Sequence, residues 1–402
     1  MVDMEFKQAA SYLNDIQKQV TGQTAIAAAN VGEFTSIATT LLQTGEDPAY
    51  NAISNLVTRT IISARDYDEQ FKGVEVSESA YGMHVRKLSF ADKDVLDDAR
   101  FLYPMAYNAS QNPANGDGNS VDMFKIRKAT PLQTNFYGQT VYMDRLTYFR
   151  DQLRGAFEGP AQLNAFITGQ FTEEANKLKQ YREDTKRGTM LNFIGGILDE
   201  ADTNRVINVL SLYKTETGLS TLTAQTIKQP DNWAPFVKWL AAFVLTLSRF
   251  MEQRSGMYQT QVGGLTINRH TPRSMQRFYM LSDVNNQITT RVLSDTFNKE
   301  LVRFGDYEEV AFWQSIKDPD AINVVPSRIG SDGIETTPEN AVSVNNILGF
   351  ICDREAFGAA RVDSWNATSP FNIDGAYWNT AYHETWRTFC DHTEKGVVLL
   401  LA

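Results

Sequence analysis

Histidines and cysteines come first in a search for chemistry, because they serve as metal ligands, general bases and nucleophiles. The chain has four histidines and two cysteines. Cys390, Asp391 and His392 are consecutive, and with His383 and Cys352 they form the only conceivable metal-binding set. Structural zinc sites usually space their ligands in tight pairs, whereas these intervals are irregular. We therefore predict no metal site and interpret the segment as a buried thiol beside a surface turn.

Motifs for hydrolysis and nucleotide binding are incomplete. The segment His383–Arg387 begins like a zinc-protease helix, but Arg387 stands where the second histidine is required. Arg254–Gly256 lacks the leading glycine of a nucleophile elbow. Gly195–Gly196 precedes no Lys-Ser or Lys-Thr pair, so it is not a phosphate-binding loop. We predict no enzyme activity, no catalytic residue and no cofactor.

Adjacent carboxylates are the remaining acid–base candidates. They occur at Asp97-Asp98, Glu173-Glu174 and Glu308-Glu309. Such neighbours more often mark solvated helix faces or helix caps than catalytic dyads, and we interpret them in that way.

Basic residues gather on two predicted strands, at residues 84–87 and 125–128. A second group surrounds a turn at residues 269–277. The net charge of −10 argues against a dedicated nucleic-acid binder. We favour contact with an acidic neighbouring subunit over contact with DNA, which stays open as the alternative.

Aromatic residues are most concentrated between positions 365 and 389, in segments that we expect to connect strands. Half of these side chains suit core packing, and the others suit protein–protein contacts, where Trp and Tyr are enriched. The candidate inter-subunit contacts are His84, Arg86, Lys87, Lys125, Arg127, Lys128, Trp365, Tyr377, Trp378 and Trp386.

Composition sets the wider limits. A chain of 402 residues is long enough for two or three sub-domains, and 42% hydrophobic with 21% charged residues is ordinary for a globular protein. Two cysteines give no disulfide framework, which favours folding in a reducing interior. The N-terminus shows no signal peptide. Lys238, Ser248 and Arg249 interrupt the apolar stretch Trp233–Met251, so we predict a buried helix there and no membrane span.

Periodicity predicts helices and strands without a regular βαβα alternation. Helical spacing covers parts of residues 1–66, a long helix within 156–198, and helices over 232–259 and 284–293. Alternation predicts strands within 74–90 and 121–130, and short strands are also predicted at 139–144, 265–269 and 277–281. A turn-rich segment, Asn112–Ser120, joins the first two strands into a projecting ribbon. The fold class expected is α+β.

The chain ends in an unbroken apolar strand within Glu394–Ala402. Because an exposed apolar edge strand would pair with other chains, we expect this strand to be inserted into a sheet.

The order of these segments resembles the major capsid protein of tailed bacteriophages, with its N-terminal arm, E-loop, P-domain with spine helix, and A-domain. The likeness is closer still to capsid subunits of small short-tailed phages. It is carried by YGMHVRKLSF at Tyr81–Phe90, by the segment Lys128–Phe157, and by RFYMLSDVNNQITTRVLSDTFN at Arg277–Asn298. INVVPS, ILGFICDREAFG and the terminal VVLLL complete the pattern.

The resemblance implies a tailed-phage capsid fold in which the spine helix packs on a mixed sheet. It implies an N-terminal arm over 1–66, an E-loop with flanking strands over 67–150, and a P-domain with spine helix over 151–215. An A-domain over 216–376 and a C-terminal return to the P-domain over 377–402 would follow. The terminal strand would then lie in the P-domain sheet beneath the long helix.

The resemblance also implies self-assembly into an icosahedral or prolate shell of pentamers and hexamers around a double-stranded DNA genome. Portal, scaffolding or decoration proteins would be partners, DNA contact would be non-specific, and no membrane would take part. The protein would be made in the host bacterial cytoplasm and reside in the virion. Two alternatives remain, an encapsulin-like bacterial nanocompartment shell and a soluble enzyme without a recognisable motif.

Overall fold

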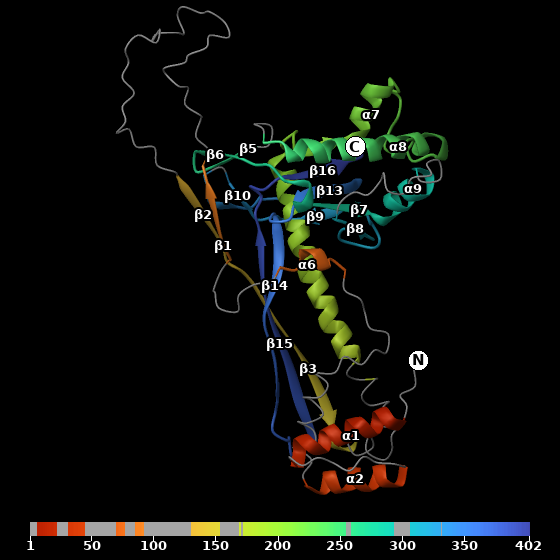
Figure 1. The fold of residues 1–402 in the computed structure, drawn as a ribbon, viewed down its shortest axis with the longest axis vertical. Coiled ribbons are helices and arrows are strands. Elements are labelled where there is room, and N and C mark those ends of the chain that lie inside the picture. Colours follow the sequence, from red (N-terminus) through yellow and green to blue (C-terminus); the bar gives the residue numbers. More distant parts are fainter. Residues whose placement is uncertain are drawn as a thin grey trace, which may run out of the picture. The chain divides into compact units, whose positions relative to one another are not determined.

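The structure is a computed structural model that describes residues 6–21, 31–44, 70–76, 85–91, 130–152, 169, 172–254, 259–292, 306–330 and 332–402 (Figure 1). The chain divides into two compact units, which are described separately below. Unit 1 comprises residues 1–84, 137–191 and 357–390, and unit 2 comprises residues 85–136, 192–356 and 391–402.

Unit 1 is organised around a three-stranded antiparallel sheet in the order β14-β15-β3. Its strands are β14 (Phe357–Thr368), β15 (Tyr377–Cys390) and β3 (Gly138–Phe149). The aromatic-rich segment that we expected to be a connector is therefore the central strand, and that expectation was wrong. The even-numbered residues from Trp378 to Trp386 are buried, and they include Thr380 and Glu384. Because two of these buried positions are polar, the sequence does not alternate between apolar and polar residues, and the strand could not be recognised from that pattern.

Shorter elements complete unit 1. Helices α1 (Phe6–Thr21) and α2 (Val31–Thr44) pack on each other and bury Leu13, Ile16 and Phe34. The 3₁₀ turn η1 (Lys72–Val74) leads to Val76, whose N–H donates to the carbonyl of Ala359 on β14 at 3.0 Å. The helix predicted around residues 53–61 lies outside the described residues.

The long helix predicted within 156–198 is α6, which begins at Thr172 and ends at Glu200. The longer part of α6, which belongs to unit 1, carries buried charged residues, among them Glu183, Lys186 and Arg187. The shorter part, which belongs to unit 2, has Phe193, Ile194 and Ile197 fully buried. The glycines at 195 and 196 do not end the helix. They allow close packing, since a Cβ on Gly195 would lie 2.6 Å from Val324 Cγ2.

Unit 2 contains a five-stranded mixed sheet in the order β4-β16-β13-β7-β8. Strand β16 (Gly396–Leu400) is antiparallel to β13 and parallel to β4, and all five of its residues are buried. The expectation that the terminal strand is inserted into a sheet is confirmed. Gly396 lies against Phe193 and Ile197, so the strand packs on the last turns of α6. The other strands are β4 (Val206–Asn208), β7 (Gln276–Leu281), β8 (Asp306–Val310) and β13 (Ile347–Asp353).

The helices of unit 2 are α7 (Val209–Thr217), α8 (Pro230–Glu252) and α9 (Ser282–Val292). Gln229 is the N-cap of α8 and Pro230 is its first residue, a position that suits proline. The helix therefore starts before the predicted range of 232–259. By length and composition alone, α8 is the one described helix that could cross a membrane. A single such helix is weak support for a span, and its face from Trp233 to Met251 is buried in unit 2.

A two-stranded ribbon, β1 (Val85–Phe90) with β2 (Pro131–Phe136), belongs to unit 2. The strand predicted over 121–130 lies outside the described residues except for its last position, and β2 follows directly after it. The minor strand pairs are β5 (Gln259–Val262) with β6 (Leu265–Asn268), β9 (Ile322–Val324) with β12 (Val342–Val344), and β10 (Arg328–Ile329) with β11 (Glu335–Thr336). The 3₁₀ turn η4 (Arg273–Met275) precedes β7.

Candidate assembly surfaces

One face of the unit 1 sheet is covered by α6 through polar and aromatic contacts. Glu384 on β15 is 2% exposed and accepts hydrogen bonds from Arg182 Nε at 2.9 Å, from the Tyr142 hydroxyl at 3.0 Å and from Trp386 Nε1 at 3.1 Å. Burial alone would raise the pKa of Glu384, but these donors, Arg182 foremost, outweigh burial and lower it. A buried carboxylate with this many donors holds the helix in one register on the sheet.

A second buried charge on the covered face is Lys186. Its side chain has no exposed surface, and its Nζ lies 2.9 Å from Glu75 Oε2 and 5.6 Å from the centre of the Trp386 ring. The ion pair and the aromatic face together replace the water that this ammonium group loses.

Glu174 lies in the first turn of α6 and is 3% exposed. Burial raises its pKa to about 7, and the hydrogen bond and negative charge of Asp144 on β3 act in the same direction. Lys177 Nζ lies 3.4 Å from Glu174 Oε2 and offsets part of this effect. Glu173 and Glu174 do lie at the start of a helix, as one of the two interpretations of such pairs expected, but Glu174 is buried and not solvated.

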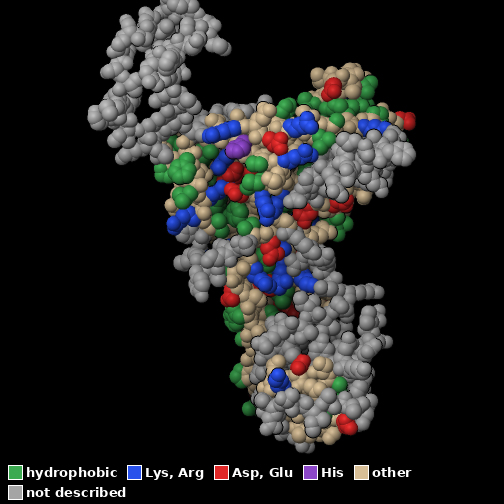
Figure 2. Space-filling view, in the orientation of Figure 1, with side chains coloured by type: hydrophobic (Ala, Val, Ile, Leu, Met, Phe, Trp, Pro, Cys, Tyr) green, Lys and Arg blue, Asp and Glu red, His purple; other side chains and the backbone are tan. Residues whose placement is uncertain are grey.

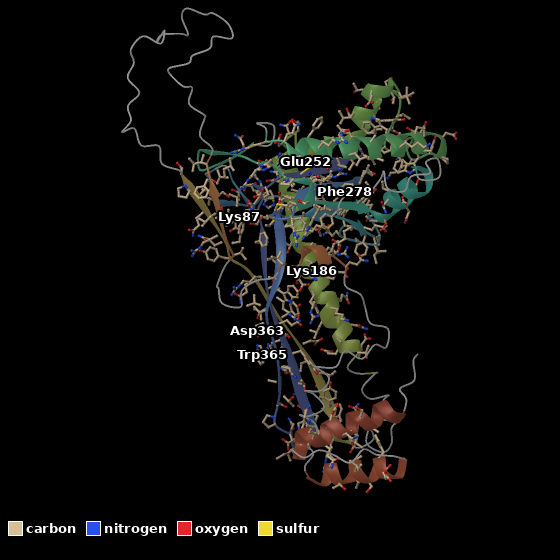
Figure 3. All side chains as sticks on the ribbon, viewed as in Figure 1. Lys87, Lys186, Glu252, Phe278, Asp363 and Trp365 are labelled. Atoms are coloured by element: carbon tan, nitrogen blue, oxygen red, sulfur yellow. The ribbon has the colours of Figure 1, made fainter. Side chains whose placement is uncertain are left out.

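The opposite face of the same sheet is open and apolar. Trp365 on β14, Met143 on β3 and Val141 on β3 are 50%, 49% and 58% exposed. His383 on β15 pairs with both Trp365 and Met143, and its ring stacks on Trp365 with centroids 4.0 Å apart. Figure 3 shows Trp365 beside Asp363 on the side of the strands away from α6. We call Val141, Met143, Asp363, Trp365 and His383 the open-face row.

The ribbon exposes a second apolar surface. Leu88 and Phe90 are 61% and 62% exposed, and Arg86 lies on the same face of β1. Strand alternation turns Lys87 to the other face, where it is half-buried. Figure 2 shows hydrophobic side chains at the surface in several places on the molecule, among charged ones. Exposed apolar groups gathered in rows are typical of interaction surfaces.

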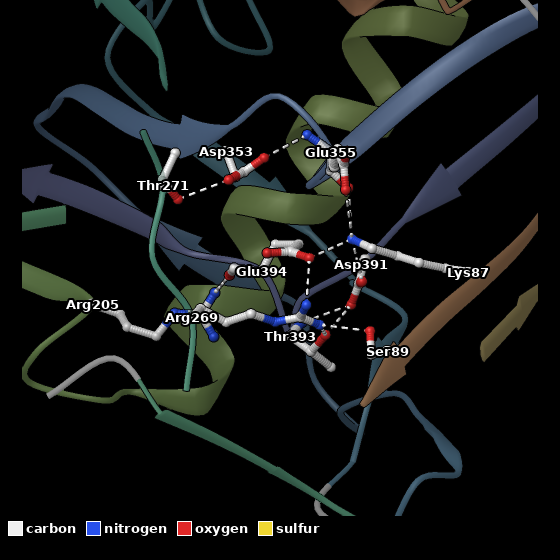
Figure 4. Close-up of polar contacts among 10 residues, drawn as sticks. All are labelled: Lys87, Ser89, Arg205, Arg269, Thr271, Asp353, Glu355, Asp391, Thr393 and Glu394. Carbon is white, nitrogen blue, oxygen red and sulfur yellow. Dashed lines mark hydrogen bonds and ion pairs between the residues drawn. The ribbon is translucent and has the colours of Figure 1, made fainter. Parts of the chain in front are cut away.

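Lys87 belongs to a charged cluster inside unit 2 (Figure 4). Its Nζ forms ion pairs with Asp391 Oδ2 at 2.9 Å and with Glu394 Oε1, and it donates to the carbonyl of Glu355 at 3.3 Å. Burial opposes the charged form of Lys87, but Asp391 and Glu394 outweigh burial and raise its pKa. The pKa of Asp391 is lowered, because Lys87 and the Thr393 hydrogen bonds overcome its burial.

The segment Asp391–Lys395, which we interpreted as a surface turn, is buried throughout, so that interpretation was wrong. Arg205 donates to the carbonyls of His392 and Glu394 at 2.9 and 3.1 Å, and Lys395 donates to the carbonyl of Met251 at 3.0 Å. Burial lowers the pKa of His392 to about 4, and its Nε2 lies 3.1 Å from the carbonyl of Asn192. The polar groups of this segment bond to residues that are distant in the sequence, so the local composition does not show that the segment is buried.

The predicted contact residues occupy different environments. Trp365 and Arg86 are exposed, and Tyr377 is partly exposed with its ring 6.0 Å from that of Phe149. Trp378 and Trp386 are 2% and 1% exposed, so their side chains are core of unit 1, and Lys87 is engaged within unit 2. His84, Lys125, Arg127 and Lys128 lie outside the described residues. The open-face residues Val141 and Met143 were missed, because Val141, Tyr142 and Met143 are apolar in succession and the sequence does not show which of them are exposed.

Within the described part of the chain, the incomplete motifs form no reaction centre. His383 and Glu384 lie on a strand and point to opposite faces, whereas the zinc-protease motif needs a helix. Among the residues that the structure describes, no three His, Cys, Asp or Glu side chains lie close enough to hold a metal ion. A polar hollow of about 590 Å³ lies beside Asp318 and Asp320, with amide and hydroxyl side chains.

The decisive comparison is with protein families. The family model described as Phi29-like phage major capsid protein matches residues 13–399, nearly the whole chain. The chain belongs to this family of phage major capsid proteins. It is a structural shell protein of the bacteriophage virion and not an enzyme, as we expected. The nanocompartment and enzyme alternatives are not supported by this membership.

Solved structures agree on the fold of this capsid protein. A chain of the Staphylococcus phage Andhra capsid has a TM-score of 0.52 at 11% identity, over 85% of this chain and 88% of that one. A chain in the structure of the head fibre and inner core protein gp22 of bacteriophage P68 has a TM-score of 0.53 at 11% identity, with the same coverage. The predicted α+β tailed-phage capsid fold, with a long helix and a mixed sheet, is confirmed. None of the curated proteins matches the sequence significantly.

Proposed function

We propose that this capsid protein closes an icosahedral or prolate shell, built from pentamers and hexamers, around double-stranded DNA. Membership of the capsid family over residues 13–399 supports this proposal. Portal, scaffolding or decoration proteins would complete the particle. With a net charge of −10, the subunit suits loose and non-specific DNA contact rather than tight binding.

We further propose the domain assignment stated from the sequence, with an N-terminal arm over 1–66, an E-loop region over 67–150, a P-domain over 151–215, an A-domain over 216–376 and a C-terminal return over 377–402. The long helix α6 and the ribbon β1–β2 support the spine helix and the base of the E-loop, respectively.

The open-face row is the observation that carries the assembly proposal at the residue level. It presents Trp365, Met143 and Val141, with Asp363 on β14 and Arg145 on β3 at its margins, and the ribbon presents Leu88 and Phe90 beside Arg86. Both surfaces are exposed and apolar, and Asp363 offers a carboxylate to Arg86 of a neighbouring copy. We assign the ribbon of one copy to the open-face row of a neighbouring copy. Because this contact joins two different surfaces, it repeats from copy to copy around a ring.

Substitution of Trp365 by serine tests this assignment. A buried interface tryptophan commonly contributes about 2 kcal/mol or more to a contact, and the loss recurs at every subunit. We expect W365S subunits to stay folded by circular dichroism and to form no shells in sedimentation and negative-stain microscopy.

The matched control is I316S, which removes another large exposed apolar side chain, 76% exposed and outside the open-face row. I316S subunits should assemble as the wild type does. Normal shell yield from W365S would contradict the assigned contact.

A further inference from the structure

The ribbon β1–β2 buries little of its own surface. None of its residues is fully buried, since half-buried and exposed positions alternate along both strands. The two strands pack mainly on each other and not extensively on another described helix or strand. Two-stranded ribbons of this kind are marginal without support from a neighbour.

The side chain of Lys87 joins the ribbon to the rest of unit 2. Its ammonium group enters a socket formed by Asp391 Oδ2 at 2.9 Å, Glu394 Oε1 and the carbonyl of Glu355 at 3.3 Å (Figure 4). A weaker contact joins Ser89 Oγ to Arg269 Nη2 at 3.4 Å.

The socket itself is part of the core. The side chains of Asp391 and Glu394 are 2% and 6% exposed, against 16% for Lys87. Arg269 Nη1 lies 3.0 Å from Glu394 Oε1, and the Thr393 N–H donates to Asp391 Oδ1 at 2.9 Å. The carboxylates are therefore held in place independently of the ribbon.

We propose that Lys87 and its socket are a latch that fixes the direction of the β1–β2 ribbon. When the latch is removed, the ribbon detaches as a unit while the five-stranded sheet stays folded. The consequence for assembly rests on the proposed function, because a latched ribbon is presented to a neighbouring copy in one orientation.

Hydrogen exchange of purified, unassembled subunits tests the latch separately from shell formation. The variant is K87M, which keeps most of the length of the side chain and removes its charge. We expect amides of β1 and β2 to exchange about tenfold faster or more, because the ribbon has lost its ion pairs with Asp391 and Glu394, while amides of β13 and β16 keep wild-type rates. R86M is the matched control on the exposed face of the same strand and should exchange as the wild type does. K87R keeps the charge and should restore much of the protection.

A second variant restores the charge balance that K87M disturbs. The combination K87M/D391N removes one cation and one carboxylate and keeps the ion pair of Glu394 with Arg269, and it too should show fast exchange in the ribbon alone. Equal ribbon protection in K87M and R86M would overturn the latch. The latch would also be overturned if β13 and β16 lost as much protection as the ribbon, or if K87M and the combined variant both unfolded. In either case Lys87 would support the whole of unit 2. Failure of wild-type subunits to form shells, together with faster ribbon exchange in K87M than in R86M, would count against the proposed function and not against the latch.

Discussion

Two glycines of α6 should respond in opposite ways to substitution by alanine. Gly196 faces His392, and a Cβ at this position would lie 2.2 Å from Nε2 and 2.4 Å from Cδ2 of the ring. The ring cannot move freely, because it stacks on Phe193 with centroids 5.5 Å apart and its Nε2 lies 3.1 Å from the carbonyl of Asn192. Gly188 lies in the same helix and is exposed, and a methyl group added there would meet no neighbouring atom within 4 Å.

The magnitudes follow from these contacts. G188A should gain about 0.5–1 kcal/mol of unfolding free energy, the usual preference of a helix for alanine over glycine. G196A has the same gain but loses about 1–3 kcal/mol through overpacking and about 1–3 kcal/mol through the displaced buried hydrogen bond. We therefore expect G196A to be destabilised by about 1–5 kcal/mol in net terms.

Urea unfolding of subunits, followed by circular dichroism, measures both variants under one set of conditions. The expected order of midpoints, from highest to lowest, is G188A, then the wild type, then G196A. A midpoint for G196A equal to or above that of G188A would refute the packing of His392 against α6.

The remaining predictions concern pH and the covered face of the unit 1 sheet. The pKa of His392 is lowered to about 4 from 6.5, so its contribution to stability is present above pH 6.5 and is lost as the pH falls through 4. We expect the stability of H392Q to change less with pH over this window, as measured by urea unfolding in a pH series. The pKa of Glu174 is raised to about 7 from 4.5, so its contribution to stability is full below pH 4.5 and is lost as the pH rises through 7. E174Q should be more stable than the wild type at pH 8 by about 2–3 kcal/mol. A stability difference that does not change between pH 4.5 and 8 would count against the burial of Glu174 beside Asp144. E384Q should be destabilised by about 3 kcal/mol or more, because Arg182 is left without its carboxylate, and a wild-type melting temperature would contradict the buried ion pair.

Elements with an uninterrupted apolar pattern could be predicted from the sequence. The apolar runs within Arg277–Leu281 and before Leu401 correspond to β7 and β16. The helical spacing within 232–259 corresponds to α8, apart from its ends. In each case the buried side chains are mostly apolar, so hydrophobicity reports burial directly.

Elements that bury polar groups could not be predicted in this way. Strand β15 places Thr380 and Glu384 in the core, and the acid is accommodated by Arg182, which lies 202 positions earlier in the chain. Lys87 finds Asp391 and Glu394 about 300 positions later in the chain. A local pattern carries no information on such distant partners, so the sequence interpretation placed both Lys87 and the Asp391 turn at the surface.

Candidate contact residues follow the same division. Trp365 is exposed as expected, whereas Trp378 and Trp386 have the same residue type and lie on the buried face of β15. Residue type alone does not separate exposed from buried tryptophans. Alternate residues of a strand point to opposite faces, so the position along the strand separates them once the strand itself is recognised.

Shell formation by the purified protein is the most direct test of the central claim. The protein should be expressed alone and with its phage partners, and the mass of the particles measured by light scattering, with electron microscopy of the same samples. Closed shells tens of nanometres wide, with the subunit fold of unit 1 and unit 2 visible in their walls, are the predicted result. A stable monomer or dimer under every condition would contradict the account, since closure of a shell needs many contacts between different surfaces.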